Sequence, residues 1–180
     1  IQKSRYVEEC ITTSKRIIEK ETPFMIRDFQ ITAFEVPHDS TDSVGYFIEY
    51  GAHRFTFATD VGHITETVGK YICKANHLIL EANYDEEMLR FGTYPPFLKE
   101  RVASPTGHLS NREAAEFIAT HYTPDLKDIW LCHLSRDNNH PELAYKTLDI
   151  RFFEEGIRVG KDVNITPLKR TTPSELYEFE

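Results

Sequence analysis

The order of its periodic segments constrains the fold of this chain more than any other feature. Segments with alternating apolar and polar residues come first, and two of them flank the short turn Gly51-Ala52. Short apolar runs then alternate with segments of helical period. We expect strands over 29–36, 44–50, 53–59, 77–81, 128–132 and 163–166, and helices over 64–74, 85–91, 95–102, 110–119 and 141–155. Hairpins followed by alternating helices and strands predict an α/β fold with a mixed sheet.

Composition limits what such a fold does. The chain has 180 residues, enough for one domain, and 21 Lys and Arg oppose 29 Asp and Glu for a net charge of −8. An acidic chain is a poor sequence-independent coat for nucleic acid, although bound metal ions supply positive charge locally in a nuclease. No apolar run reaches the roughly 18–20 residues that span a bilayer. Cys10, Cys73 and Cys132 show no paired spacing, which predicts a reducing, cytoplasmic setting.

Three expected strands end next to a residue whose side chain can bind a metal. His38, Asp60 and His133 each follow an expected strand, and functional groups of α/β proteins tend to lie just beyond strand ends. Imidazole nitrogens and carboxylate oxygens are suitable ligands for zinc, manganese or iron. Each residue also has a plain structural interpretation, as a hydrogen-bonding His or as an Asp in a turn. The spacing alone does not bring the three residues into one site.

Two further residues are candidates for acid–base work. His108 lies at the start of a helix capped by Ser110 and Glu113, where free N–H groups favour a phosphate and a His could donate a proton. The alternative is a helix-entry loop without a ligand. Glu81 ends an apolar strand, so its carboxylate needs a partner, for which a His, an Arg or solvent would serve. Five other histidines show no partner pattern and are expected at the surface or in packing: His53, His63, His77, His121 and His140.

Taken in order, these segments resemble the C-terminal half of a metallo-β-lactamase-fold hydrolase of the nuclease branch. Val36-Pro37-His38-Asp39-Ser40, Thr59-Asp60-Val61-Gly62 and Cys132-His133-Leu134-Ser135 are similar to the third, fourth and fifth metal motifs of that fold. Glu81-Ala82-Asn83-Tyr84 and Gly107-His108-Leu109-Ser110 resemble the Glu and His motifs of RNase Z. The resemblance covers about residues 29–140 and implies part of an αββα sandwich.

Within that fold the chain most resembles the WalJ/YycJ-type nucleases. Asp85-Glu86-Glu87-Met88-Leu89, Tyr94-Pro95 and Ser135-Arg136-Asp137-Asn138-Asn139 are similar to parts of their pattern that RNase Z lacks. The stretch between His38 and Asp60 is also too short for the tRNA-binding arm of RNase Z. The resemblance therefore implies a DNA exonuclease that acts on nucleic acid with two divalent metal ions, zinc or manganese.

The resemblance also implies a role for each residue. His38 would bind the first metal, Asp60 would bridge both metals and His133 would bind the second. His108 would contact the scissile phosphate, with Glu81 supporting it. Substrate contacts are expected from four polar residues: Asn83, Ser110, Ser135 and Asn138.

The leading His-x-His-x-Asp-His signature of the fold is absent from the chain. We expect 1–28 to connect from a missing N-terminal half, 29–166 to be the C-terminal part of the domain and 167–180 to be a polar tail. The metal site would then be incomplete in this chain. The missing half could instead belong to another chain, or the chain could be a degenerate, non-catalytic interaction module. A small-molecule ester or thioester hydrolase of the same fold is the other functional alternative.

Overall fold

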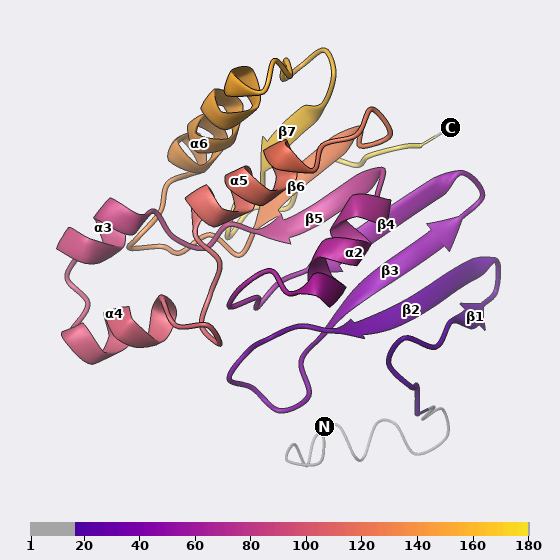
Figure 1. The fold of residues 1–180 in the computed structure, drawn as a ribbon, viewed down its shortest axis with the longest axis horizontal. Helices are drawn as coiled ribbons and strands as arrows, with labels where there is room; N and C mark the ends of the chain where they lie inside the picture. Colours follow the sequence, from indigo (N-terminus) through magenta and orange to yellow (C-terminus); the bar gives the residue numbers. More distant parts are fainter. Residues whose placement is uncertain (1–16, 180) are drawn as a thin grey trace.

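The computed structural model of the protein describes residues 17–179, and a seven-stranded mixed sheet runs through them (Figure 1). The strands are β1 Phe24–Ile26, β2 Phe29–Glu35, β3 Val44–Tyr50, β4 His53–Ala58, β5 His77–Glu81, β6 Asp128–Cys132 and β7 Asn164–Pro167. Neighbours in the sheet follow the order of the chain. β1 to β4 pair antiparallel, whereas β4 to β7 pair parallel, so the expected mixed sheet is confirmed.

The helices lie where the sequence predicts them, within two residues at each end. They are α2 Glu66–Lys74, α3 Glu86–Phe91, α4 Pro96–Val102, α5 Asn111–Thr120 and α6 Pro141–Glu154. The capping box before α5 is formed: Ser110 Oγ accepts from the Glu113 N–H, and the Glu113 carboxylate accepts from the Ser110 N–H, each at 3.1 Å. None of the helices in the described part of the chain is long and apolar enough to cross a membrane.

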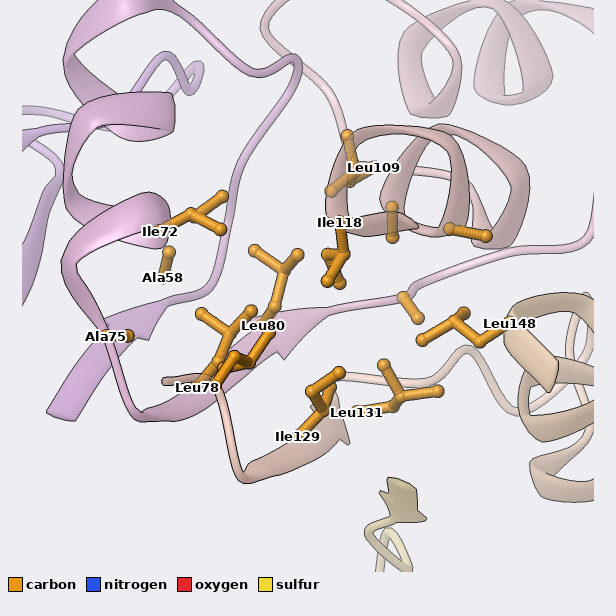
Figure 2. Packing of buried hydrophobic residues seen from close by; sticks show 14 of the residues in the cluster. Ala58, Ile72, Ala75, Leu78, Leu80, Leu109, Ile118, Ile129, Leu131 and Leu148 are labelled. Atoms are coloured by element: carbon orange, nitrogen blue, oxygen red, sulfur yellow. The ribbon is translucent and has the colours of Figure 1, made fainter. Parts of the chain in front are cut away.

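The core lies between one face of the sheet and the helices α2, α5 and α6. Leu78 and Leu80 of β5 meet Ile118 of α5 in the middle of this layer, with Ile129 and Leu131 of β6 beside them (Figure 2). The predicted stripe of α6 is confirmed, because Ala144, Leu148 and Phe152 are all fully buried. Residues of one parity on each strand thus build a single apolar core.

The opposite face of the sheet is aromatic and largely uncovered. Phe29 stacks on Tyr50 with ring centroids 4.8 Å apart, and Tyr46 is paired in register with Phe57. These four side chains are between 36% and 47% exposed. They alternate along the strands with Phe47 and Thr56, which face α2, so they point away from the helices. A sheet whose second face is apolar and exposed is unusual for an isolated layer.

Some features differ from the sequence expectation. β1 was not expected, because it is three residues long and its turn contains Arg27 at φ 53° rather than a glycine. Residues 168–179 form neither helix nor strand, but Tyr177 and Phe179 contact Trp130 on the aromatic face. Cys10 and most of the expected connecting segment lie in 1–16, outside the described residues.

Candidate functional site

Four strands deliver the candidate residues to one edge of the sheet. β2 and β4 are both antiparallel to β3, and β4, β5 and β6 are mutually parallel, so all four run in the same direction. The carboxyl ends of these strands therefore meet at the same edge. The residues at or just after these ends are His38, Asp60, Glu81 and His133.

His38 and His133 both lie close to the Asp60 carboxylate. The distance from Asp60 Oδ1 is 3.7 Å to His38 Nε2 and 3.4 Å to His133 Nδ1. His38 Nδ1 is 2.9 Å from the carbonyl oxygen of Gly107, which accepts hydrogen bonds only, so Nδ1 must be the donor. In the neutral ring Nε2 then keeps its lone pair on the side of Asp60. This tautomer is the one that a metal-binding imidazole requires.

The buried carboxylate of Glu81 connects the candidate residues by hydrogen bonds. Its side chain is fully buried, and Oε1 accepts from Nδ1 of both His108 and His133, each at 2.8 Å. Oε2 accepts from the Val61 N–H at 2.6 Å. Burial opposes ionisation of this carboxyl, but the bonds from His108, His133 and Val61 outweigh it and hold its pKa below the usual value. Glu81 therefore positions three segments of the site at once.

The two histidines on Glu81 are left with their Nε2 atoms for other partners. Their rings lie close together, with centroids 5.1 Å apart, and both line the same cavity. The hydrogen bond to Glu81, together with the charges of Glu81 and Asp60, raises the pKa of His133 against the opposing effect of burial. The site thus favours positive charge at His133, as expected where carboxylates gather around an imidazole.

The donor set fits part of a divalent-metal site. Asp60, Glu81, His108 and His133 each place one candidate ligand atom within 4.8 Å of the others. Both Glu81 oxygens are already used as hydrogen-bond acceptors, so we assign Glu81 to positioning rather than to ligation. His38 lies outside this group, with its Nε2 3.7 Å from Asp60 Oδ1. His38, Asp60 and His133 would be the ligands, whereas two tetrahedral zinc ions would need about four each. These residues would therefore supply only some of the ligands that two metal ions need.

The backbone turns sharply at two of these residues. Asp60 has φ 56° and His133 has φ 55°, in the left-handed region that non-glycine residues rarely adopt. Such a conformation costs on the order of 1 kcal/mol per residue and persists only where surrounding contacts enforce it. The bonds of Glu81 to the Val61 N–H and to His133 are contacts of this kind.

A cavity of about 220 Å³ opens in front of the histidines. α4 and the turn before it form one wall through Tyr94, Leu98 and Arg101, and Arg170 contributes from the C-terminal segment. Sequence reasoning assigned no role at the site to these residues. Arg170 carried no local signal, because it lies in the segment expected to be a tail. Arg101 is held by Asp39, whose Oδ2 lies 2.6 Å from the guanidinium Nε.

Of the four expected substrate contacts, two reach the cavity. Asn83 and Ser135 line it, and Asn83 Nδ2 also donates to the His133 carbonyl oxygen at 2.8 Å. Ser110 and Asn138 are 0% and 1% exposed and do not line it. Ser110 is engaged in the α5 cap, and Asn138 Nδ2 donates to Ser135 Oγ at 3.4 Å. In the described residues both side chains are closed off from solvent, so a contact of either with substrate stays a prediction.

His77 was expected at the surface or in packing, and it is buried in the packing of the sheet. It also has partners that the sequence did not indicate: its Nδ1 donates to Asp128 Oδ2 at 2.9 Å, and its Nε2 lies 3.1 Å from Nδ1 of His53. His77 and Asp128 are register partners at the start of β5 and β6. No spacing along the sequence signals this pair, because only sheet formation brings the two residues together.

Comparison with known sequences relates this chain to bacterial nucleases. The model of the beta-lactamase superfamily domain matches residues 2–127. The chain is 34% identical over 149 residues to the exodeoxyribonuclease YycJ of Bacillus anthracis, covering 83% of this chain and 56% of that protein. It is 31% identical over 179 residues to the exodeoxyribonuclease WalJ of Streptococcus pneumoniae, covering 99% and 66% respectively. The chain thus spans less than two thirds of the length of these relatives.

Solved structures agree on the fold. The metallo-β-lactamase fold protein YhfI of Bacillus subtilis superposes with a TM-score of 0.61 at 18% identity, over 90% of this chain and 58% of that one. A diphosphatase of the PhnP family superposes with a TM-score of 0.54 at 14% identity, over 89% and 49%. The predicted fold class is confirmed by these likenesses.

Proposed function

Because this chain belongs to the beta-lactamase superfamily, we propose that the complete protein is a metal-dependent phosphodiester hydrolase that acts on DNA as an exonuclease. The observation that carries the proposal is the meeting of His38, Asp60 and His133 with the His108–Glu81 pair beside one cavity, which the three histidines line. The names of the bacterial relatives support DNA as the substrate. A cytoplasmic location would follow from that substrate.

His38, Asp60 and His133 would hold divalent metal ions, zinc or manganese, with further ligands from outside the described residues. Divalent ions at such a site lower the pKa of bound water and offset charge on a phosphate. The protein residues fix the geometry around them. Gly107 and Glu81 hold the Nδ1 atoms of His38 and His133, so each ring presents Nε2 to a ligand.

His108 is the catalytic residue that would contact the phosphate. Glu81 accepts from its Nδ1, and this leaves Nε2 to face a phosphodiester in the cavity. From Nε2 a protonated ring would donate to a phosphate oxygen and then to the leaving oxygen. Glu81 would act by orienting the ring, and Asn83 and Ser135 would contact the substrate from the loops that follow β5 and β6.

We also propose that residues 29–166 are the C-terminal part of a two-sheet sandwich, with 1–28 leading in from its N-terminal half and 167–180 as a terminal segment. The exposed aromatic face of the sheet supports this arrangement. A second sheet packed on Phe29, Tyr46, Tyr50 and Phe57 would bury them as the first layer of helices buries the other face. The remaining metal ligands would come from that half.

The test is Asp60→Ala in the full-length protein. Labelled single-stranded DNA is incubated with zinc or manganese, and we expect the rate to fall by at least about 10³-fold because the central carboxylate of the site is removed. Asp149→Ala is the matched control, since Asp149 is a similarly half-buried Asp on α6 away from the cavity. The thermal midpoints of both variants show whether the fold is kept.

The same assays separate the alternatives. Full nuclease activity in Asp60→Ala would contradict the assignment of the site. Hydrolysis of thioesters or lactones by the wild type without cleavage of DNA would identify a small-molecule hydrolase. A full-length protein that purifies without metal and hydrolyses neither class of substrate would be a non-catalytic module.

A further inference from the structure

The chain leaves the sheet between β5 and α5 to form α3 and α4 beside the site (Figure 1). α4 contains no buried residue, and its half-buried Leu98 and Val102 line the cavity instead of the core. Core packing therefore does little to stabilise this helix. What α4 does is form one wall of the site.

Two aromatic side chains of this segment point into solvent. Phe91 at the end of α3 is 74% exposed, and Phe97 in the first turn of α4 is 71% exposed. Burying a Phe side chain gains roughly 1.5–3 kcal/mol, so neither residue contributes its full apolar surface to folding. Phe97 itself does not line the cavity. Its neighbours Leu98 and Arg101 do, so Phe97 lies beside the cavity, at what we call its rim.

Three cations lie on this segment of an acidic chain. α3 and α4 carry Arg90, Lys99 and Arg101, and their acids are Glu86 and Glu87 in the first turn of α3 and Glu100. The Arg90 guanidinium lies 5.2 Å from the centroid of the Phe91 ring. Lys99 Nζ donates to the Arg90 carbonyl oxygen at 2.8 Å, which places the end of α3 beside α4. Cations and aromatic rings therefore lie close together on α3 and α4.

We propose that Phe97 is a stacking platform for a base of single-stranded DNA whose backbone enters the cavity, with Phe91 as a second platform. Exposed rings stack on any base, while nearby cations attract phosphates, and this combination is typical of single-strand binding surfaces. A duplex hides the faces of its bases, so the rim would select single strands. Arg170 adds a further cation on the cavity wall. This inference rests on the proposed function for its substrate class.

The rim is tested by binding, with a chelator present so that no cleavage occurs. The full-length protein is titrated into fluorescein-labelled dT12 and into an abasic strand of the same length and charge, and anisotropy is measured. Phe97→Ala should raise the Kd for dT12 by about 5- to 100-fold, because one stacked base is lost. The Kd for the abasic strand should stay within about twofold, since its phosphates are unchanged.

Two further variants make the test specific. Phe153→Ala is the matched control, because Phe153 is 77% exposed in the last turn of α6 and does not line the cavity, and it should leave both Kd values unchanged. Phe97→Trp should keep the affinity for dT12. An unchanged Kd for dT12 in Phe97→Ala, or an equal loss on the abasic strand, would overturn the stacking role.

Failure of this inference is distinguishable from failure of the proposed function. If the wild type with metal cleaves DNA while Phe97→Ala binds dT12 normally, the nuclease assignment is kept and the stacking role of Phe97 is rejected. In the converse case the wild type hydrolyses neither DNA nor the simple diester bis(p-nitrophenyl) phosphate, yet Phe97→Ala loses affinity only for dT12. The stacking role of Phe97 is then kept and the nuclease activity is rejected.

Discussion

Each end of β5 and β6 carries a hydrogen-bonded pair of a His and a carboxylate, and the two pairs lie in different settings. At the carboxyl end His133 donates to Glu81 at 2.8 Å, and at the amino end His77 donates to Asp128 at 2.9 Å. The pKa of His133 is raised, whereas that of His77 is lowered. The two pairs are about equally short, so bond length does not explain the difference.

Burial is distributed differently within the two pairs. At the site Glu81 is fully buried and His133 is 41% exposed, so the bond and the charges of Glu81 and Asp60 outweigh burial of the ring. At the other end the His77 ring is 7% exposed, and burial outweighs the bond to Asp128, which is less enclosed. A buried carboxylate facing an open imidazole favours a cation, whereas a buried imidazole favours the neutral form.

The two ends also face different surroundings. His133 opens onto the cavity, where a ligand can reach it. His77 is packed against Phe179, with ring centroids 4.4 Å apart, and against Phe55 at 4.6 Å. The comparison teaches that a His–carboxylate pair becomes a candidate site only where the ring has access to a ligand. We therefore interpret the His77–Asp128 pair as a structural contact.

The largest expected effect comes from removing the carboxylate at the site end. Glu81→Ala leaves the Val61 N–H and two histidines without their acceptor, and we expect the free energy of unfolding to fall by about 3–5 kcal/mol. Asp128→Ala at the other end should cost about 1–3 kcal/mol, because the carboxylate is partly solvated. Urea unfolding of the full-length protein with chelator measures both values.

Glu81→Gln is the conservative control for that comparison. It keeps the volume and one acceptor oxygen, so it should unfold more readily than the wild type but less readily than Glu81→Ala. Equal losses in Glu81→Ala and Asp128→Ala would break the distinction between the two ends.

An intermediate effect is expected in the pH dependence of stability. An unfolded His has a pKa near about 6.5, and the folded pKa of His77 lies below it, so the unfolded chain binds a proton first as pH falls. The contribution of His77 is therefore fully present above about pH 6.5 and is lost as pH falls through that value toward the folded pKa. His77→Gln should flatten this part of the stability curve.

The measurement compares unfolding free energies of wild type and His77→Gln between about pH 5 and pH 7.5, with chelator present. His63→Gln provides the control, since His63 is exposed and lies outside the pair. Parallel curves for wild type and His77→Gln would contradict burial as the cause of the shift.

The smallest expected effect is that of the aromatic cover at the amino end. Phe179 contacts the rings of His53, Phe55, His77 and Trp130 but remains 39% exposed. Phe179→Ala should lower the free energy of unfolding by about 1 kcal/mol, as expected for loss of aromatic pairs. Nuclease activity should be unchanged, and a large loss of activity would mean that the two ends are coupled.

Much of the fold followed from local pattern. The bounds of β3 and β5 are the expected ones, and Ser110 with Glu113 marked the start of α5 correctly. These features succeed because alternation, helical period and caps are properties of a few neighbouring residues. β1 was missed because a three-residue strand is too short for any period to appear.

The sequence predicted which residues make up the candidate site, but it did not predict which contacts they make. The sequence by itself determined that His38, Asp60, Glu81 and His133 end strands, because each stands where a periodic apolar run stops. Only the tertiary structure decided that Glu81 serves two histidines and that Arg170 reaches the cavity. It also decided that Ser110 and Asn138 are buried. Such facts depend on which distant segments pack together, and on the burial and hydrogen bonding that result, and no local spacing encodes them.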